Sequence, residues 1–423
     1  MRDGAPEGYR PHTTATLAPA LAALPEIAER LGGGADAWRV REVGDGNINL
    51  VFIVEGPAGS LVAKQALPYV RLVGESWPLP LERASFEHAA LVEHGRHARA
   101  RLPAVHHFDD AQALIVMEHL TPHVILRKGL IAGTVYPHLA EHVAELLAAT
   151  LFFTSDLHLP AAEKKQLMKF FCDNTELCKI TEDLIFTDPY RAAELNRHTS
   201  PQLDALALQF RRDTPLKRAA QELKRRFLGD AQALIHGDLH TGSLMVTERD
   251  TRAIDPEFAF YGPMGFDIGA VLGNLMLAYY AQDGHEGRPG ERDDYREWIL
   301  TQLTVIWEGF EARFRAFWAE AGTGDGFVAE LFAAPEDAAV RAAAKDRYMA
   351  ALLGDSLRFA GMKMIRRILG LAHVEDLESI ADPDRRAACE RRALAMAREL
   401  VLYGEGVGSI HEVAPAARFH RLR

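Results

Sequence analysis

Residues 234–269 read LIHGDLHTGSLMVTERDTRAIDPEFAFYGPMGFDIG, and ionisable side chains are concentrated there between short apolar runs. One apolar run covers residues 243–246 and another covers residues 253–254, with a charged turn between them. Two apolar runs joined by a polar turn are typical of a β-hairpin. The stretch therefore predicts a hairpin with polar loops at both of its outer ends.

Three carboxylates flank this hairpin. Asp238 precedes the first strand, and Asp255 and Glu257 follow the second, so we expect them to lie close together. Neighbouring carboxylates repel each other unless a cation lies among them, and oxygen ligands suit Mg²⁺ or Mn²⁺. Mg²⁺ takes one or two protein carboxylates, which leaves the third to orient a hydroxyl nucleophile and accept its proton. The pattern predicts a kinase, with Asp238 as catalytic base and Asp255 and Glu257 as metal ligands.

Two other interpretations of these residues are open. Carboxylates in a turn are often simply solvated, although the full order of strand, loop, hairpin and acidic motif is hard to obtain by accident. The alternating residues His236, Asp238 and His240 are also spaced to share one face of a strand and bind a transition metal, as in a hydrolase. Gly237 and the loop character of the segment disfavour that regular strand.

The composition is that of a soluble globular protein. The chain has 423 residues, of which 48% are hydrophobic and 25% charged, and this length suits two lobes. A net charge of −11 disfavours a nucleic-acid surface, which needs clustered Lys and Arg. The three cysteines form no disulfide framework, and no apolar run reaches the length of a membrane span. We expect a cytoplasmic protein with no membrane or nucleic-acid partner.

Short apolar runs separated by turn residues dominate the first part of the chain. A leader with an amphipathic helix at 17–31 is predicted within residues 1–36, and a nucleotide-binding lobe is predicted over 37–120. Five runs predict an antiparallel five-stranded sheet in that lobe. They cover residues 38–43, 50–55, 61–66, 105–108 and 113–118.

A glycine-containing turn joins the first two of these strands. Gly44, Gly46 and Asn47 lie in it, and the absence of side chains on the glycines lets backbone amides approach phosphate oxygens. Such a turn alone is a weak signal, but Lys64 follows one strand later, where it would neutralise the α- and β-phosphates of a nucleotide. We expect Glu87, in the helix predicted over 80–95, to pair with Lys64, and Glu82 is the less favoured candidate for this pairing.

The fifth predicted strand ends in a segment suited to nucleotide recognition. Glu118, His119 and Leu120 precede Thr121-Pro122, a predicted crossing between lobes. Their backbone amides and carbonyls would read an adenine edge. A buried strand followed by a linker is the structural alternative, and the two interpretations are compatible.

Residues 121–423 form a predicted helical lobe that carries the hairpin. In the helix that begins near residue 265, Asp267 is expected as the N-cap, as a brace for the backbone amides around His236, or as both. Apolar residues at spacings near 3.6 predict the main helices. These cover residues 138–153, 162–180, 201–211, 216–228, 265–281, 292–321, 335–370 and 382–404.

An arginine pair lies in one of the late helices. Arg366 and Arg367 are embedded among Met, Ile and Leu residues, where an unpaired guanidinium is costly. Substrate hydroxyls, a developing phosphate or a carboxylate from another helix would each satisfy them. The sequence leaves the choice between a binding site and a structural ion pair open.

With these residues, the chain resembles the protein-kinase-like superfamily of small-molecule kinases. Within that superfamily it most resembles the 5-methylthioribose kinase family. The glycine turn, Lys64 and the acidic motifs are shared with aminoglycoside phosphotransferases and choline kinases, so they imply the fold and phosphoryl transfer. The narrower resemblance rests on HGDLHTGS at 236–243, DPE at 255–257 and FAFYGPMGFDIG at 258–269. It implies an α+β, bilobal protein-kinase-like fold.

The resemblance also implies a reaction. The γ-phosphate of ATP passes to the anomeric hydroxyl of 5-methylthioribose and gives 5-methylthioribose 1-phosphate, a step of methionine salvage, with Mg²⁺ as cofactor. Members of the family are often homodimers. Asp238 would take the hydroxyl proton, Asp255 and Glu257 would hold Mg²⁺, and Lys64 would order the phosphates.

Further site residues carry over from the family. Arg366 and Arg367 match the arginine pair that holds the thioribose, and Trp77 matches a Trp-bearing loop that closes over the site. Ser243 stands where broader kinases place a metal-binding Asn, a departure that the narrower family shares.

Two rival functions remain. An aminoglycoside- or choline-type phosphotransferase binds cationic substrates and needs an acidic pocket, which the paired arginines disfavour. A nucleotide-binding pseudokinase would not need all four of the residues Lys64, Asp238, Asp255 and Glu257, so their joint presence disfavours this alternative.

Overall fold

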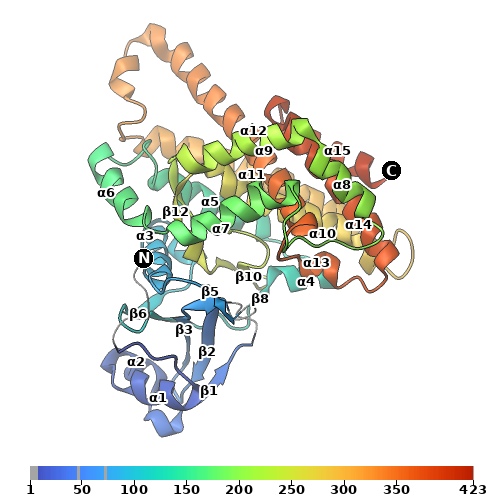
Figure 1. The fold of residues 1–423 in the computed structure, drawn as a ribbon. Coiled ribbons are helices and arrows are strands. Elements are labelled where there is room, and N and C mark those ends of the chain that lie inside the picture. Colours follow the sequence, from blue (N-terminus) through green and yellow to red (C-terminus); the bar gives the residue numbers. More distant parts are fainter. Residues whose placement is uncertain (1–7, 45–47, 71–73, 423) are drawn as a thin grey trace. The chain divides into compact units, whose positions relative to one another are not determined.

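The computed structural model of this chain describes residues 8–44, 48–70 and 74–422 (Figure 1). The chain divides into two compact units. The first contains Met1–Pro122 together with Asn174–Leu177 and Ile254–Ala259, and the second contains the remaining residues. The segment with Asp255 and Glu257 is thus built into the first unit.

The first unit is organised around the predicted five-stranded antiparallel sheet, which is confirmed with the order β1-β2-β3-β7-β6. Its strands are β1 (Arg39–Glu42), β2 (Asn49–Glu55), β3 (Ser60–Ala66), β6 (Val105–Asp109) and β7 (Leu114–Glu118). Alternate side chains point to opposite faces of a sheet. Phe52 and Ala63 lie in one hydrophobic core, whereas Lys64 points to the other face.

Helices cover both faces of this sheet. Leu17 and Ile27, from α1 (Thr14–Ala22) and α2 (Pro25–Leu31), pack into the core on the face of Phe52. On the face of Lys64 lies α3 (Arg83–Ala98). The strands β4 (Tyr69–Val70) and β5 (Gly74–Pro78) form a separate two-stranded ladder.

The single helix predicted over 17–31 is wrong, because the chain breaks between α1 and α2. Leu24 is extended and Pro25 opens the second helix. Pro25 occupies the first turn of α2, where its missing N–H costs no helical hydrogen bond, and its ring disfavours the helical conformation at Leu24.

The second unit is mostly helical, and two of its helices meet through glycines. In α10 (Met264–His285), a β-carbon on Gly269 would lie 2.5 Å from the Ser356 carbonyl oxygen, and one on Gly273 would lie 2.7 Å from that of Ala360. Both acceptors belong to α12 (Ala338–Leu369). Glycines four residues apart on one face therefore let the backbones of α10 and α12 come close together.

The other helices of the chain from residue 123 onward include most of those predicted, with small shifts at their ends, and the short helices α4, α13 and α15, which were not predicted. They are α4 (Leu126–Ala132), α5 (Leu139–Phe153), α6 (Ala161–Phe171), α7 (Thr175–Phe186), α8 (Asp204–Arg212), α9 (Thr214–Gly229), α11 (Asp293–Ala321), α13 (Glu375–Glu378), α14 (Pro383–Tyr403) and α15 (Val413–Arg421).

The single helix predicted over 162–180 is wrong, because the chain breaks between α6 and α7. Asn174 lies at the break and is buried. Its side-chain amide donates to the carbonyl oxygens of Glu257 and Ala259, at 2.9 and 3.0 Å. Asn favours such bonds to backbone groups over a helix interior, and in this case the bonds hold the acidic motif of the first unit.

The predicted hairpin is confirmed in the second unit. Strand β10 (Leu244–Val246) pairs antiparallel with β11 (Thr251–Ala253) and also with β8 (Val124–Ile125). Before it, β9 (Ala233–Ile235) pairs with β12 (Phe260–Gly262). The polar loop 236–243 therefore leaves one short ladder and enters another, which restrains it at both ends.

Within the described ranges 8–44, 48–70 and 74–422, none of the helices combines the length and apolar character needed to cross a bilayer.

Candidate functional site

Lys64 joins two carboxylates in the first unit. Its Nζ lies 2.8 Å from Glu87 and 2.7 Å from Oδ1 of Asp255. The expected pairing of Lys64 with Glu87 is therefore present, and Asp255 completes a triad. Burial by itself would lower the pKa of Lys64, but Asp255 and Glu87 outweigh burial and raise it, so the ammonium stays charged.

Glu257 is held by two residues that the sequence did not single out. Nδ2 of Asn49 donates to Oε2 of Glu257 at 3.0 Å, and Nε of Arg83 lies 3.6 Å from the same oxygen. Arg83 is fully buried and also donates to Oδ1 of Asn49 at 3.0 Å. A weak signal existed, since Arg83 opens α3 one turn before Glu87, on the same face of the helix.

The backbone at Asp255 is strained. Asp255 has φ 64° and ψ 49°, the left-handed region that Asp tolerates better than most residues, and it precedes the 3-10 turn Pro256–Phe258. Its side chain remains 47% exposed, whereas that of Glu257 is only 9% exposed. Strained residues of this kind are frequent at functional sites. The turn leaves Asp255 accessible while Glu257 is packed against Arg83.

The donor set fits Mg²⁺. Asp255 and Glu257 offer hard oxygen atoms, and Mg²⁺ characteristically takes one or two protein carboxylates together with phosphate and water. Among the described residues, no group of three or more His, Cys, Asp or Glu side chains forms a metal-ligand cluster. His236, Asp238 and His240, the three residues of the transition-metal interpretation, therefore do not form such a cluster.

Several predicted nucleotide contacts belong to the same unit. Gly44 is an exposed turn residue, while Gly46 and Asn47 lie outside the described residues. Trp77 belongs to β5, and its side chain also lies outside the description.

The predicted adenine-reading segment follows the strand β7. Glu118 ends this strand, and its amide donates to the Ala104 carbonyl oxygen at 2.8 Å. The His119 ring contacts Oγ of Ser60 at 2.9 Å, and Leu120 is buried. The three predicted residues thus form an ordered strand end.

The loop 236–243 of the second unit is braced by Asp267, as one of the two interpretations predicts. Its carboxylate accepts from the backbone amides of His236 and Gly237, at 2.6 and 3.0 Å. The N-cap interpretation is wrong, because α10 begins at Met264 and Pro263 is its cap. Gly237 has φ 82°, so this position of the loop favours a glycine.

Asp238 is surrounded by cationic and hydrogen-bonding partners from distant parts of the sequence. Its Oδ1 lies 3.1 Å from Nζ of Lys363, and its Oδ2 lies 3.2 Å from Nε2 of His240 and 3.8 Å from Arg367. Burial by itself would raise the pKa of Asp238, but His240 and Lys363 outweigh it and hold the pKa well below its usual range. Asp238 is therefore ionised, and 26% of its side chain stays exposed.

The His240 ring is in a single tautomer. Its Nδ1 accepts from the backbone amides of Gly242 and Ser243, at 2.9 and 3.1 Å, so the proton lies on Nε2, which donates to Asp238. Burial lowers the pKa of His240 to about 3, so the ring is neutral. The Ser243 hydroxyl donates to the Asp238 carbonyl oxygen at 2.7 Å and closes the loop.

Arg366 and Arg367 share one backbone acceptor. Nη1 of Arg367 and Nη1 of Arg366 lie 3.0 and 3.5 Å from the carbonyl oxygen of Ala372, which is held at φ 58°. Among the residues that the structure describes, the Nε atoms of both arginines are buried without a hydrogen-bond partner. Orphaned donors of this kind are costly unless a ligand meets them. The pair is thus held in place by Ala372 and still has donors to offer.

One further cation near this loop was missed by the sequence interpretation. Nε of Arg127 lies 2.8 Å from the buried Asp376, and a β-carbon on Gly242 would lie 2.7 Å from its Nη1. Arg127 also lowers the pKa values of Arg366 and Arg367, after the larger effects of burial, so the three guanidinium groups lie near one another. No local sequence pattern joins these residues.

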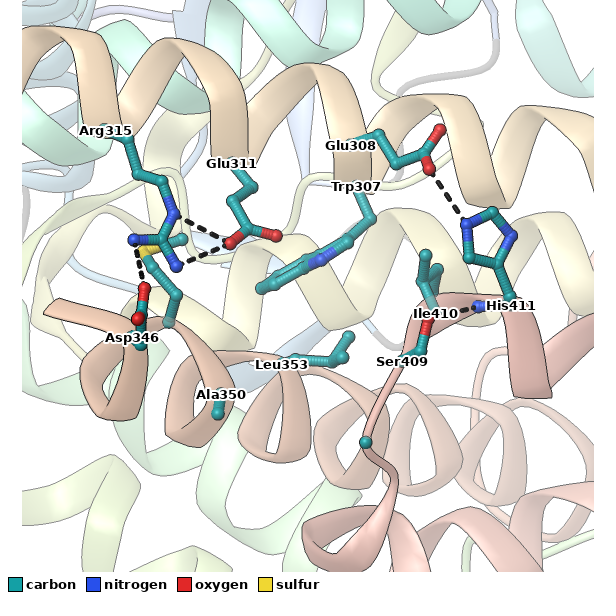
Figure 2. Close-up of a pocket in the computed structure, with 12 residues that line it drawn as sticks. Trp307, Glu308, Glu311, Arg315, Asp346, Ala350, Leu353, Ser409, Ile410 and His411 are labelled. Atoms are coloured by element: carbon teal, nitrogen blue, oxygen red, sulfur yellow. Dashed lines mark hydrogen bonds and ion pairs between the residues drawn. The ribbon is translucent and has the colours of Figure 1, made fainter. Parts of the chain in front are cut away.

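A separate pocket of about 280 Å³ lies on the second unit (Figure 2). Figure 2 shows Trp307 between α11 and α12, with the pairs Arg315–Asp346 and Glu308–His411 at its sides, 2.9 and 3.0 Å apart. None of the predicted site residues lines it. Its charged groups are paired with each other, so the pocket offers no clear anchor for a ligand.

Sequence comparisons with known proteins agree with one another. A model of the phosphotransferase enzyme family matches residues 39–302. Methylthioribose kinase 1 of Oryza sativa subsp. japonica is 50% identical over 93% of this chain and 92% of its own length. The methylthioribose kinase of Escherichia coli O45:K1 is 46% identical over 99% of this chain and its full length, 100%. Among solved structures, a glucosamine kinase in complex with glucosamine, ADP and inorganic phosphate is 14% identical, with a TM-score of 0.44, over 90% of this chain and 85% of that one.

Proposed function

Because the chain belongs to the methylthioribose kinase family, we infer that it phosphorylates methylthioribose and takes the phosphate from ATP. The acceptor is the anomeric hydroxyl, and the product is methylthioribose 1-phosphate, as in methionine salvage. The O–P bond to the sugar forms as the bond between the γ-phosphorus and the β,γ-bridging oxygen breaks, and ADP leaves.

Residues of the first unit bind the nucleotide. Lys64 is charged and held by Glu87, so its ammonium is oriented for the α- and β-phosphates. Backbone groups of Gly44, Gly46 and Asn47 contact phosphate oxygens, and the segment 118–120 reads the adenine edge.

Asp255 and Glu257 hold Mg²⁺, and we assign the larger contribution to Asp255 because it is the more exposed carboxylate. Bound Mg²⁺ would neutralise charge on the phosphates during transfer. Ser243 is the third proposed ligand. Its hydroxyl proton is donated to the Asp238 carbonyl oxygen, and its oxygen accepts from the backbone amide of His240 at 3.3 Å, which leaves one lone pair for the metal.

Asp238 orients the acceptor hydroxyl and takes its proton. Its low pKa makes it a weak base, so its main effect is to accept a hydrogen bond from the hydroxyl and align it. The proton follows late, because the transition state of phosphoryl transfer is loose and the nucleophile acquires positive charge only as the O–P bond forms.

Arg366 and Arg367 bind sugar hydroxyls and the transferring phosphate through donors that the described residues leave unsatisfied. A cation-lined acceptor site suits a neutral polyol that becomes a phosphate ester. It does not suit choline or an aminoglycoside, which carry positive charge.

We also propose that Trp77 closes over the sugar and that the chain forms a homodimer, as expected from the family.

The observation that carries this proposal is the ionised Asp238 placed between Lys363 and Arg367. The test is ADP release by purified protein with ATP and Mg²⁺, and with methylthioribose, ribose, choline or kanamycin as acceptor. We expect methylthioribose to be preferred by at least about tenfold in kcat/KM over ribose, since burial of the methylthio group contributes about 1–3 kcal/mol. Turnover with choline or kanamycin alone would refute the sugar assignment, and ADP binding without turnover of any acceptor would favour a pseudokinase.

A further inference from the structure

Lys363 is a buried cation that faces the proposed catalytic base. It lies on α12, is only 2% exposed, and its Nζ lies 3.1 Å from Oδ1 of Asp238 and 4.1 Å from the centre of the Phe266 ring. A buried ammonium is costly, and an apolar side chain of similar size would often be more stable at such a place. Packing alone therefore does not account for a lysine at this position.

The two oxygen atoms of Asp238 have different partners. Lys363 contacts Oδ1, while the neutral His240 ring donates from Nε2 to Oδ2. The His240 ring is itself held by the amides of Gly242 and Ser243. A carboxylate restrained at both oxygens has little freedom to rotate, so its remaining lone pairs point in defined directions.

We propose that Lys363 is a positioning residue for phosphoryl transfer, which holds Asp238 in the orientation that receives the acceptor hydroxyl. This inference rests on the proposed function and deepens it. Lys363 neither gives nor takes the transferred proton: the hydroxyl proton passes to Asp238, and Nζ of Lys363 acts only through the hydrogen bond that it donates to Oδ1. His240 restrains the second oxygen and acts through the same carboxylate.

The position of Lys363 depends on the close approach of two helices. Gly269 and Gly273 of α10 allow α12, which carries the lysine, to lie against it. Asp267 of the same helix α10 braces the loop that carries Asp238. The helix α10 thus orders the loop on one side and the lysine-bearing helix on the other.

The test compares two lysines of α12 that both lie over aromatic rings. Lys363→Met removes the charge facing Asp238 and keeps an unbranched side chain that is one atom shorter. Lys345→Met is the matched control, because Nζ of Lys345 lies 4.8 Å from the centre of the Trp318 ring, outside the proposed site. We expect Lys363→Met to lower kcat about 100-fold, the scale of a misplaced reacting group, with the KM for ATP within about twofold. Lys345→Met should leave kcat within about twofold of wild type.

Lys363→Arg separates charge from position. Arg keeps the charge but places its donors differently, so we expect kcat about tenfold below wild type and above that of the Met variant. Thermal unfolding checks that each variant is folded. A folded Met variant with kcat within about twofold of wild type would overturn the proposal. If the Met variant does not fold, wild-type kcat in the Arg variant would overturn it.

The acceptor in these assays is the panel compound that the wild-type protein turns over fastest. Failure of wild type with methylthioribose therefore counts against the proposed function, whereas an unaffected kcat in the Lys363 variants counts against the positioning role.

Discussion

Each unit contains a cluster of charged side chains around the proposed site residues, and the two clusters carry opposite net charges. In the first unit, Glu87, Asp255 and Glu257 face Lys64 and Arg83, so carboxylates outnumber cations among these described residues. This surplus favours a further cation, which suits Mg²⁺ bound with nucleotide phosphates.

In the second unit the imbalance is reversed. Lys363, Arg366 and Arg367 lie around Asp238, and Arg127 adds a further guanidinium beside the same loop. A surplus of positive charge favours an acceptor that gains a phosphate. Carboxylates that look alike in the sequence therefore acquire different chemistry from the cations that the fold places next to them.

The largest effect is expected from Asp238→Asn, which removes the carboxylate at the centre of the second cluster. The amide keeps the shape but does not accept the proton, so kcat should fall about 10³-fold while ADP binding is retained. Steady-state kinetics and calorimetry measure the two quantities. Glu248→Gln, in the exposed hairpin turn, is the control. Near-normal kcat in the Asn variant would remove Asp238 from its assigned role.

A smaller effect is expected from Asp255→Asn in the first cluster. Asn tolerates the left-handed backbone, so the turn should survive while a charged metal ligand is lost. We expect kcat to fall about 10²-fold and the Mg²⁺ concentration for half-maximal rate to rise. Glu257→Gln should shift the Mg²⁺ titration less, because Glu257 is more buried. An equal or larger shift in the Glu257→Gln variant would contradict the assignment of the larger contribution to Asp255.

The smallest effect concerns the packing on which the second cluster depends. Gly269→Ala places a β-carbon 2.5 Å from the Ser356 carbonyl oxygen, so we expect it to lower the free energy of unfolding by about 1–3 kcal/mol. Gly95→Ala, in α3 with no described atom within 4 Å of the new carbon, should instead stabilise by up to about 1 kcal/mol. Chemical denaturation measures both. A neutral Gly269 variant would show that the α10–α12 contact is not tight.

Local patterns predicted most of the elements. The five strands, the hairpin and the main helices follow from apolar periodicity and turn residues, which act over a few residues. The breaks at Pro25 and Asn174 were missed for different reasons. Pro25 is a local signal that was overlooked. Asn174 lies in the break just before α7 and is bonded to Glu257 and Ala259, far along the chain.

The candidate site likewise contains contacts that the order of residues predicts and contacts that only the folded chain creates. The pairing of Lys64 with Glu87 was predicted from their order along the chain, in which a glycine-containing turn is followed by a strand with Lys64 and then by a helix with Glu87. Asn49 and Arg83 were missed, since only the folded sheet brings them to Glu257. The predicted proximity of Asp238 to Asp255 relates the two units and stays a prediction.

By itself, the sequence determined which residue types carry the chemistry. The acidic motifs, Lys64 and the arginine pair can be recognised because their order along the chain is distinctive. Only the tertiary structure decided which cations meet which carboxylates. Lys363 and Asp238 are 125 residues apart in the sequence, and they are in contact because glycines in α10 let α12 pack closely against α10. Contacts of this kind depend on the packing of whole helices, and no spacing within either segment encodes them.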